Sequence, residues 1–164
     1  MSGTLQVGNI IGPTTGADAN KVIIPSGQTL HAPGHVIQVV NMSTVTSINS
    51  TTSSLTGTSL LLNITPKFST SKILVNINAH MSGSGTSQGF MQILRDGSTL
   101  ITDDEIFFSR TGDNYNMNGI QKLDSPNTTS TIQYRLWIRK SSGSYIALNQ
   151  DGGGSDMTLM EIAQ

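Results

Sequence analysis

The fold is decided by one alternating stretch, Ser130 to Lys140, which reads STIQYRLWIRK. Apolar side chains occupy every second position in it, at Ile132, Tyr134, Leu136 and Ile138. Successive side chains of a β-strand point to opposite faces of the sheet. A period of two therefore predicts a strand with one face in a hydrophobic core and the other face outward.

The same period recurs on both sides of this stretch. Helical periodicity is nearly absent, and the chain contains only two glutamates. Further strands are predicted at 59–65, 71–80, 88–95, 98–102, 144–149 and 156–163. Leu60, Leu62 and Ile64 share one face of the first of these, while Leu74 lies on the face opposite Ile73, Val75 and Ile77 in the second.

Turn signals separate these runs. Asp96-Gly97 is the strongest, because both central residues of a type I′ hairpin turn need a positive φ angle. Other clusters of Gly, Ser, Asn, Asp and Pro lie at 82–87, 111–118, 124–127 and 151–155. Roughly eight or nine short strands after Gly34 favour an all-β fold, an antiparallel β-sandwich or jelly roll over residues 34–164.

Residues 1–33 have a different character. Their short extended pieces, 4–11, 21–24 and 28–31, are interrupted by Gly-Pro, Pro-Ser-Gly and Ala-Pro-Gly. One copy has too few apolar side chains to close a core. We expect an extended N-terminal segment for oligomerisation or docking, with a boundary at Pro33-Gly34. Its buried residues in an assembly would be Leu5, Val7, Ile10, Val22, Ile24 and Leu30.

Charge and composition narrow the classes of function. The net charge is -1, so a broad basic surface for nucleic acid is not expected. Only Asp18, Lys21, Lys67 and Lys72 are charged before Arg95, which suggests that much of the first half is covered in an assembly. There is no cysteine. No signal peptide or membrane-length apolar run is visible. We therefore expect that the protein is synthesised in a cytoplasm and does not insert into a membrane.

Catalytic and metal motifs are weak. Gly85-Thr86-Ser87-Gln88-Gly89 matches a nucleophile elbow, but a strand is predicted after it where that motif needs a helix. The acidic runs 103–105 and 151–156 fit a solvated turn better than a calcium loop or a carboxylate pair. His31 or His35 could hold an ion only if symmetry copies met on an axis. We expect no enzymatic activity and no cofactor.

One loop is a candidate for contact with another molecule. The run 110–118 is rich in Asn and contains a tyrosine, which suits adaptable hydrogen bonding and stacking on sugars. Its candidate residues are Arg110, Asp113, Asn114, Tyr115 and Asn116. An ordinary polar connection is the alternative. Trp137 could be a stacking platform if it faces outward, or else a core or inter-subunit anchor.

Several stretches resemble one family. They are Gly34 to Val40, Ile64-Thr65-Pro66 followed by Ser71 to Val75, Ser130 to Leu136, and Thr158 to Ile162, with Lys21 to Leu30 before them. Together they resemble the C-terminal β domains of small fibre-like structural proteins of tailed phages, particularly those of marine bacteria and cyanobacteria. The resemblance implies a homotrimer with a jelly-roll-like head, attached to other virion proteins by its N-terminal part.

Three functions follow from this interpretation. The first is a short trimeric fibre or appendage of a phage virion that contacts the host surface. The second function is a capsid decoration, cement or head-fibre protein, which stays open because the sequence shows no long shaft. A third is a lectin-like module that binds a host surface glycan. For the virion functions, we expect release from the host by lysis.

Overall fold

A computed structural model describes residues 8–19, 21–30, 32–102, 106–110 and 115–164. The chain separates into two units, Met1–His31 and Ala32–Gln164. The first unit has no helix or strand within its described residues, 8–19 and 21–30. Its turns rest on local hydrogen bonds, such as that from the backbone N–H of Ala19 to the carbonyl of Gly16.

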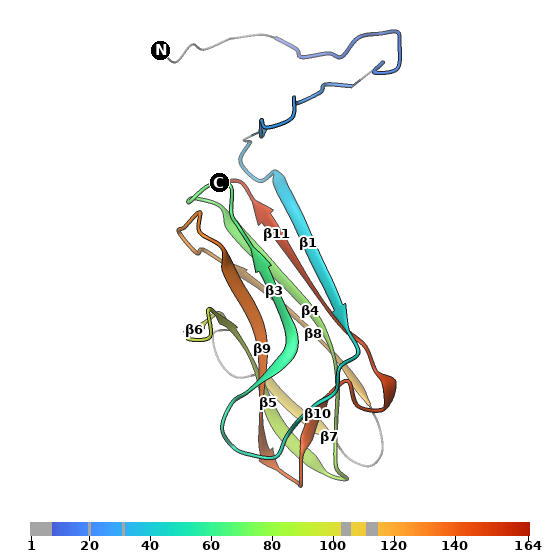
Figure 1. The fold of residues 1–164 in the computed structure, drawn as a ribbon, viewed down its shortest axis with the longest axis vertical. Coiled ribbons are helices and arrows are strands. Elements are labelled where there is room, and N and C mark those ends of the chain that lie inside the picture. The colour runs from blue at the N-terminus through green and yellow to red at the C-terminus, as the bar shows by residue number, and fades with distance from the viewer. Residues whose placement is uncertain (1–7, 20, 31, 103–105, 111–114) are drawn as a thin grey trace. The chain divides into compact units, whose positions relative to one another are not determined.

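The second unit is built almost wholly of strands (Figure 1). They are β1 (Val36–Thr44), β2 (Ile48–Ser50), β3 (Thr56–Ile64), β4 (Lys72–Gly83), β5 (Ser87–Arg95), β6 (Thr99–Leu100), β7 (Ile106–Arg110), β8 (Asn116–Asp124), β9 (Ile132–Ser142), β10 (Ile146–Leu148) and β11 (Ser155–Ile162). A single 3-10 turn, η1 (Gln150–Gly152), separates β10 from β11 among the described residues.

The strands pair as a long hairpin folded over on itself. β5 pairs with β7, β4 with β8, β3 with β9, and β1 with β11, all antiparallel. Two further pairings, β11 with β4 and β9 with β5, join these pairs into two sheets. One sheet has the order β1-β11-β4-β8 and the other β3-β9-β5-β7, with β10 and β2 extending the first and β6 the second. This is the jelly-roll arrangement of an antiparallel sandwich, and the predicted fold class is confirmed.

The core lies between the two sheets and follows the predicted alternation. Ile132, Tyr134, Leu136 and Ile138 of β9 are all buried. From the opposite sheet, the core receives Ile73, Val75, Ile77, Ala79 and Met81 of β4. The predicted inward faces of both strands are therefore confirmed.

The turn predicted at Asp96-Gly97 is also confirmed. Both residues have positive φ angles, 51° at Asp96 and 73° at Gly97. The N–H of Ser98 donates to the carbonyl of Arg95, which closes the turn between β5 and β6. The return strand is shorter than the predicted 98–102, since β6 spans Thr99–Leu100.

A partly buried polar cluster ties the two sheets together at one end. Nη1 of Arg95, at the end of β5, lies 2.5 Å from Oδ2 of Asp124, at the end of β8. The hydroxyl of Tyr134 donates to the same oxygen at 2.6 Å. Burial raises the pKa of Tyr134 well above its ordinary value, and its hydrogen bond to Asp124 adds to the effect. Burial alone would lower the pKa of Arg95, but the hydrogen bond and charge of Asp124 raise it overall.

A fully buried carboxylate, that of Glu161, anchors the loop after β3. Glu161 of β11 is fully buried and accepts a hydrogen bond from Nε2 of Gln38 on β1. It also accepts the backbone N–H groups of Lys67, at 2.7 Å, and Phe68, at 3.3 Å. These three donors satisfy a group whose burial would otherwise be costly.

Candidate interaction surfaces

The run 110–118 contains more strand than expected, so the predicted extent of the turn needs correction, while contact with another molecule stays a prediction. Arg110 is the last residue of β7 and pairs with Ser87 of β5. Asn116 is the first residue of β8 and pairs with Met81 of β4. Strand pairing therefore extends into both ends of the run that was predicted to be a turn. Asp113 and Asn114 lie outside the described residues.

Tyr115 is part of a packed cluster at the start of β8. Its ring stacks on the ring of His80 with centroids 5.2 Å apart, and its hydroxyl donates to Oδ2 of Asp151. A Cβ placed on Gly153 would lie 1.9 Å from Nδ1 of His80, so the glycine backbone packs against the imidazole. The tyrosine is still 46% exposed, which leaves part of its ring available to another molecule.

The two described histidines, His35 and His80, are not gathered into a metal site. His35 lies in a turn, where its N–H donates to the carbonyl of Ala32, and His80 stacks on Tyr115. His31 lies outside the described residues. In the part of the chain that is described, no three His, Asp or Glu side chains converge as metal ligands. An ion held by His31 or His35 between symmetry copies stays a prediction.

Ser87 lies in a buried strand and not in a nucleophile elbow. It is buried at the start of β5, where its hydroxyl donates to the carbonyl of Ser84. A strand follows it, whereas a nucleophile elbow continues into a helix. The described residues form no pocket beside it.

No helix in the described ranges has the length and hydropathy to cross a bilayer.

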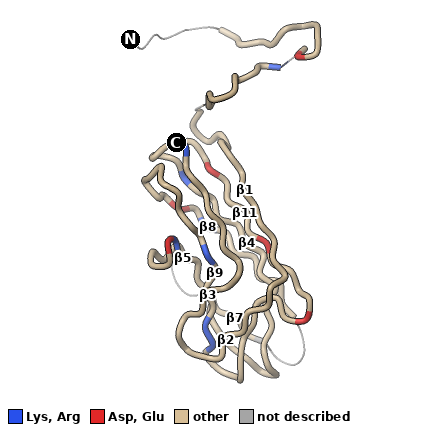
Figure 2. Tube along the Cα trace, in the orientation of Figure 1, with Lys and Arg blue, Asp and Glu red and all other residues tan. Residues whose placement is uncertain are grey.

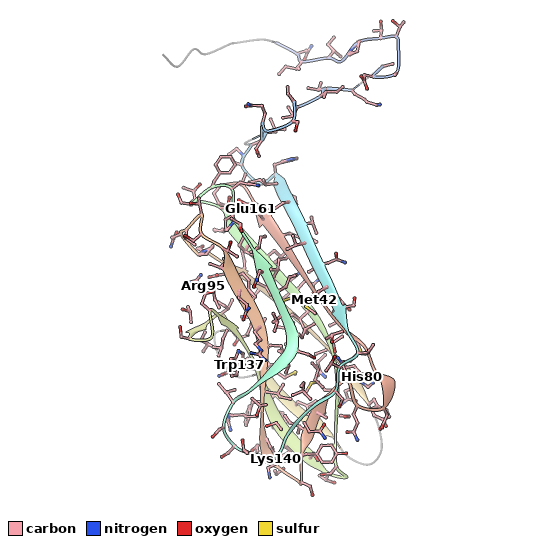
Figure 3. All side chains as sticks on the ribbon, in the orientation of Figure 1. Met42, His80, Arg95, Trp137, Lys140 and Glu161 are labelled. Carbon is pink, nitrogen blue, oxygen red and sulfur yellow. The ribbon has the colours of Figure 1, made fainter. Side chains whose placement is uncertain are left out.

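The outer face of the β3-β9-β5-β7 sheet carries a stack of arginine and aromatic side chains. Trp137, labelled in Figure 3, is half-buried there on β9. The guanidinium carbon of Arg135 lies 5.2 Å from the centre of its ring. The guanidinium of Arg139 lies 4.3 Å from the ring of Phe90, which meets Phe107 edge-on at 5.7 Å. This face can stack against planar or sugar-like groups and attract negative charge.

Glycine makes room for this stack on β3. A Cβ on Gly57 would lie 2.6 Å from the guanidinium carbon of Arg135. Nε of Arg135 donates to the carbonyl of Thr58 at 2.7 Å, which fixes the side chain across β3. The indole N–H of Trp137 is buried without a partner in the structure.

The outer face of the β1-β11-β4-β8 sheet has a different character. Strand pairing aligns Val39, Met160, Leu74 and Leu123 in one row across all four strands. The adjacent row places Val36 beside Ile162. We call these six residues the apolar patch. Three of them are exposed, namely Val36 (41%), Val39 (55%) and Leu123 (52%).

Sequence reasoning found only part of this patch. Leu74 was predicted to lie opposite the core residues of its strand, which the structure bears out, since it is half-buried while Ile73 and Val75 are fully buried. Its neighbours in the row come from strands far apart in sequence. A row across a sheet depends on strand order and register, which the alternation of one strand does not contain.

The N-terminal segment presents its apolar side chains to solvent. Ile10, Val22, Ile24 and Leu30 are between 42% and 71% exposed. Ile11, exposed by 87%, and Ile23, exposed by 56%, are also open to solvent, although they were not among the residues predicted to be buried in an assembly. Leu5 and Val7 lie outside the described residues.

Comparison with known proteins gives a distant structural likeness. No family model matches the chain, and a search of curated proteins finds no match. Among solved structures, the chain is similar to the D431N mutant VP2 protein of infectious bursal disease virus, solved as derived T=1 particles. The likeness has 12% sequence identity and a TM-score of 0.36, and covers 93% of this chain. The chain spans only 41% of that VP2 protein.

Proposed function

We propose that this protein is a structural component of a phage virion, a short trimeric fibre or appendage held by its N-terminal segment. The observation that carries the proposal is the exposure of the segment's apolar side chains, which reaches 87% at Ile11. A segment without strands in its described residues has no core of its own to cover them.

Association of identical segments would remove these side chains from water. Burying one Val, Leu or Ile side chain contributes about 1.5–3 kcal/mol. Ile10, Ile11, Val22, Ile23 and Ile24 could each contribute in every copy, together with Leu30 and the predicted Leu5 and Val7. Three copies around one axis give each segment two neighbours, which is what a short fibre base requires.

The sandwich suits a role as the exposed head of such an appendage. Its sheets hold no large charged field, as Figure 2 shows by the few coloured positions along the strands. The resemblance to small fibre-like proteins of tailed phages supports attachment through other virion proteins and release on lysis. Contact with a host would involve Tyr115 and its neighbours Arg110, Asp113, Asn114 and Asn116.

The molar mass in solution tests this proposal directly. Sedimentation equilibrium of the full chain should give three times the 17.4 kDa of one copy. Replacing Ile11 and Ile23 together by Asp should shift the protein toward single chains, because a carboxylate in the shared core is uncompensated. A wild-type chain that stays monomeric at micromolar concentration would overturn the proposal.

Two alternative functions are each favoured by a specific observation. The same exposed segment would suit a capsid decoration or cement protein that docks on head subunits, and labelling of intact particles in the electron microscope separates head from tail. The arginine–aromatic stack around Trp137 favours a lectin-like module that binds a host surface glycan. Binding to purified host polysaccharide, lost on Trp137→Ala, would support that function.

A further inference from the structure

The apolar patch lies on a sheet face that is almost free of charge. Within the four described strands, the outward-facing charged residues are Lys72, which pairs with Ile162 at one margin of the patch, and Asp156 toward the other end. Figure 2 shows β1 without a charged residue along its whole length. Depletion of charge around an exposed apolar centre is typical of a protein–protein interface.

The polar part of this face carries side chains that both donate and accept hydrogen bonds. Next to the patch, strand pairing aligns Asn41, Thr158, Asn76 and Gln121 in a row. Amide and hydroxyl groups both donate and accept hydrogen bonds, so a face of this kind can satisfy an identical one. In the following row, Nδ2 of Asn78 already donates to Asp156 at 3.1 Å.

The opposite face of the sandwich is less suited to a second copy. Its centre carries Arg135 and Arg139, and a packed copy would have to remove guanidinium groups from water. The two faces therefore differ in which partner they favour. The charge-poor face favours an identical chain, while the arginine–aromatic face favours a charged or sugar-like ligand.

Chain connectivity places the patch close to the N-terminal segment in sequence. Five residues lie between Leu30 of the segment and Val36 at the start of β1, so the chain takes six steps from one to the other. Each residue spans at most about 3.6 Å, so the patch begins within roughly 22 Å of chain from the segment. Copies joined through their segments would hold their patches at a high effective concentration.

We propose that the outer face of the β1-β11-β4-β8 sheet, centred on the apolar patch, packs against a second copy of the same chain. This inference rests on the proposed trimer and names the surface of the sandwich that it uses. Around a three-fold axis, one margin of this face would meet a different margin of the same face on the next copy, so apolar and amide groups are available on both sides of the contact.

A matched pair of substitutions tests the assignment. Leu123→Lys places a charge on the patch, and Phe107→Lys places one at a position of similar exposure on the opposite face, 53% against 52%. Removal of a central interface side chain commonly costs a factor of ten or more in affinity, and we expect about 100-fold weaker association for Leu123→Lys. Phe107→Lys should associate like the wild type, as measured by sedimentation equilibrium.

The absence of cysteine allows a second test that does not depend on disrupting the assembly. Single variants Leu123→Cys and Phe107→Cys would be treated with a maleimide, and the rate of labelling followed by mass spectrometry. We expect slow labelling at position 123 in the trimer, faster labelling on dilution to single chains, and fast labelling at position 107 throughout.

Each contrary result has a distinct meaning. A trimeric wild type, with Leu123→Cys and Phe107→Cys variants that are labelled equally fast, would overturn the inference and leave the proposed function intact. Slow labelling at position 123 in a single chain would mean that the chain's own N-terminal segment covers the patch, which also overturns it. A wild type that never associates would end the proposed function and this inference with it.

Discussion

The two units of this chain contain the same apolar residue types in opposite situations. In the sandwich, Ile77, Leu136 and Ile138 are fully buried, whereas Ile11 and Ile23 of the N-terminal segment are largely exposed. The difference lies in strand pairing and not in hydrophobicity. Each sandwich strand presents alternate side chains to a facing sheet, while the described part of the segment has no strand with which to form one. Apolar content alone therefore does not distinguish a core from an assembly surface.

The sharpest test of this contrast is a cavity in the sandwich. Leu136→Ala removes a fully buried side chain at the centre of β9, and we expect a loss of about 2–5 kcal/mol in unfolding free energy. Gln92→Ala, on the outer face of the neighbouring β5, should change stability by less than about 0.5 kcal/mol. Urea denaturation followed by circular dichroism measures both. Equal effects at the two positions would contradict the assigned inward and outward faces.

The inter-sheet cluster should have the next largest effect. Asp124→Ala leaves Arg95 partly buried without its carboxylate and removes the acceptor of Tyr134, so we expect a loss of about 2–3 kcal/mol. Tyr134→Phe keeps the packing and loses one hydrogen bond, for about 1 kcal/mol.

The same tyrosine gives a pH dependence with a defined sign. Its pKa is raised in the folded protein, whereas an unfolded tyrosine titrates near its ordinary value of about 10. The unfolded state therefore loses its proton first, and stability that is complete below pH 10 falls as the pH rises above it. The difference between the wild type and Tyr134→Phe should shrink by up to about 1.4 kcal/mol per pH unit above pH 10. A constant difference would mean that the phenol is not held protonated.

A smaller effect is expected at the hairpin turn. Gly97 has a φ of +73°, so Gly97→Ala should lower the unfolding free energy by about 1 kcal/mol. Gly119→Ala is the control, because that glycine has ordinary φ and the nearest atom to an added Cβ, Oδ1 of Asn78, lies 3.8 Å away. Thermal unfolding of both variants compares them, and an equally stable Gly97→Ala variant would argue against the left-handed turn.

The N-terminal segment should show the smallest effect on the stability of one chain. Ile11→Ser and Ile23→Ser change exposed side chains, so the unfolding free energy of the dissociated protein should move by less than about 0.5 kcal/mol. Measurement at a concentration too low for association isolates this term. A large loss there would show that the segment packs within its own chain, contrary to the contrast drawn above.

Much of the fold was predictable because β periodicity is a local signal. The alternation in β9 and β4 identified both strands and their inward faces, and Asp96-Gly97 identified its turn, since these features need only neighbouring residues. Asn116 was assigned to a turn cluster because its run is rich in Asn and Gly, but pairing with Met81 of β4 draws it into β8. Tertiary context overrides weak local propensity at such an edge.

The interaction surfaces were harder to predict from sequence. The contact of Tyr115 with His80 and Asp151 joins residues 35 and 36 positions away from the tyrosine, and no local pattern encodes it. The arginine–aromatic stack was visible only as the outward half of one alternating strand, with Trp137 as its single marker. Phe90 and Phe107 complete it through the register of β5 and β7, which sequence periodicity does not fix.

The pairing of β1 with β11 joins the first and last strands of the sandwich within the described residues. β11 lies between β1 and β4, so a polypeptide released by the ribosome before Ser155 leaves an interior slot in the sheet and not merely a missing edge. Such a product would leave β1 without the strand that it pairs with, and the apolar row would lack Met160. Such a truncated product would therefore lack the continuous outer face that we propose as the contact with a second copy.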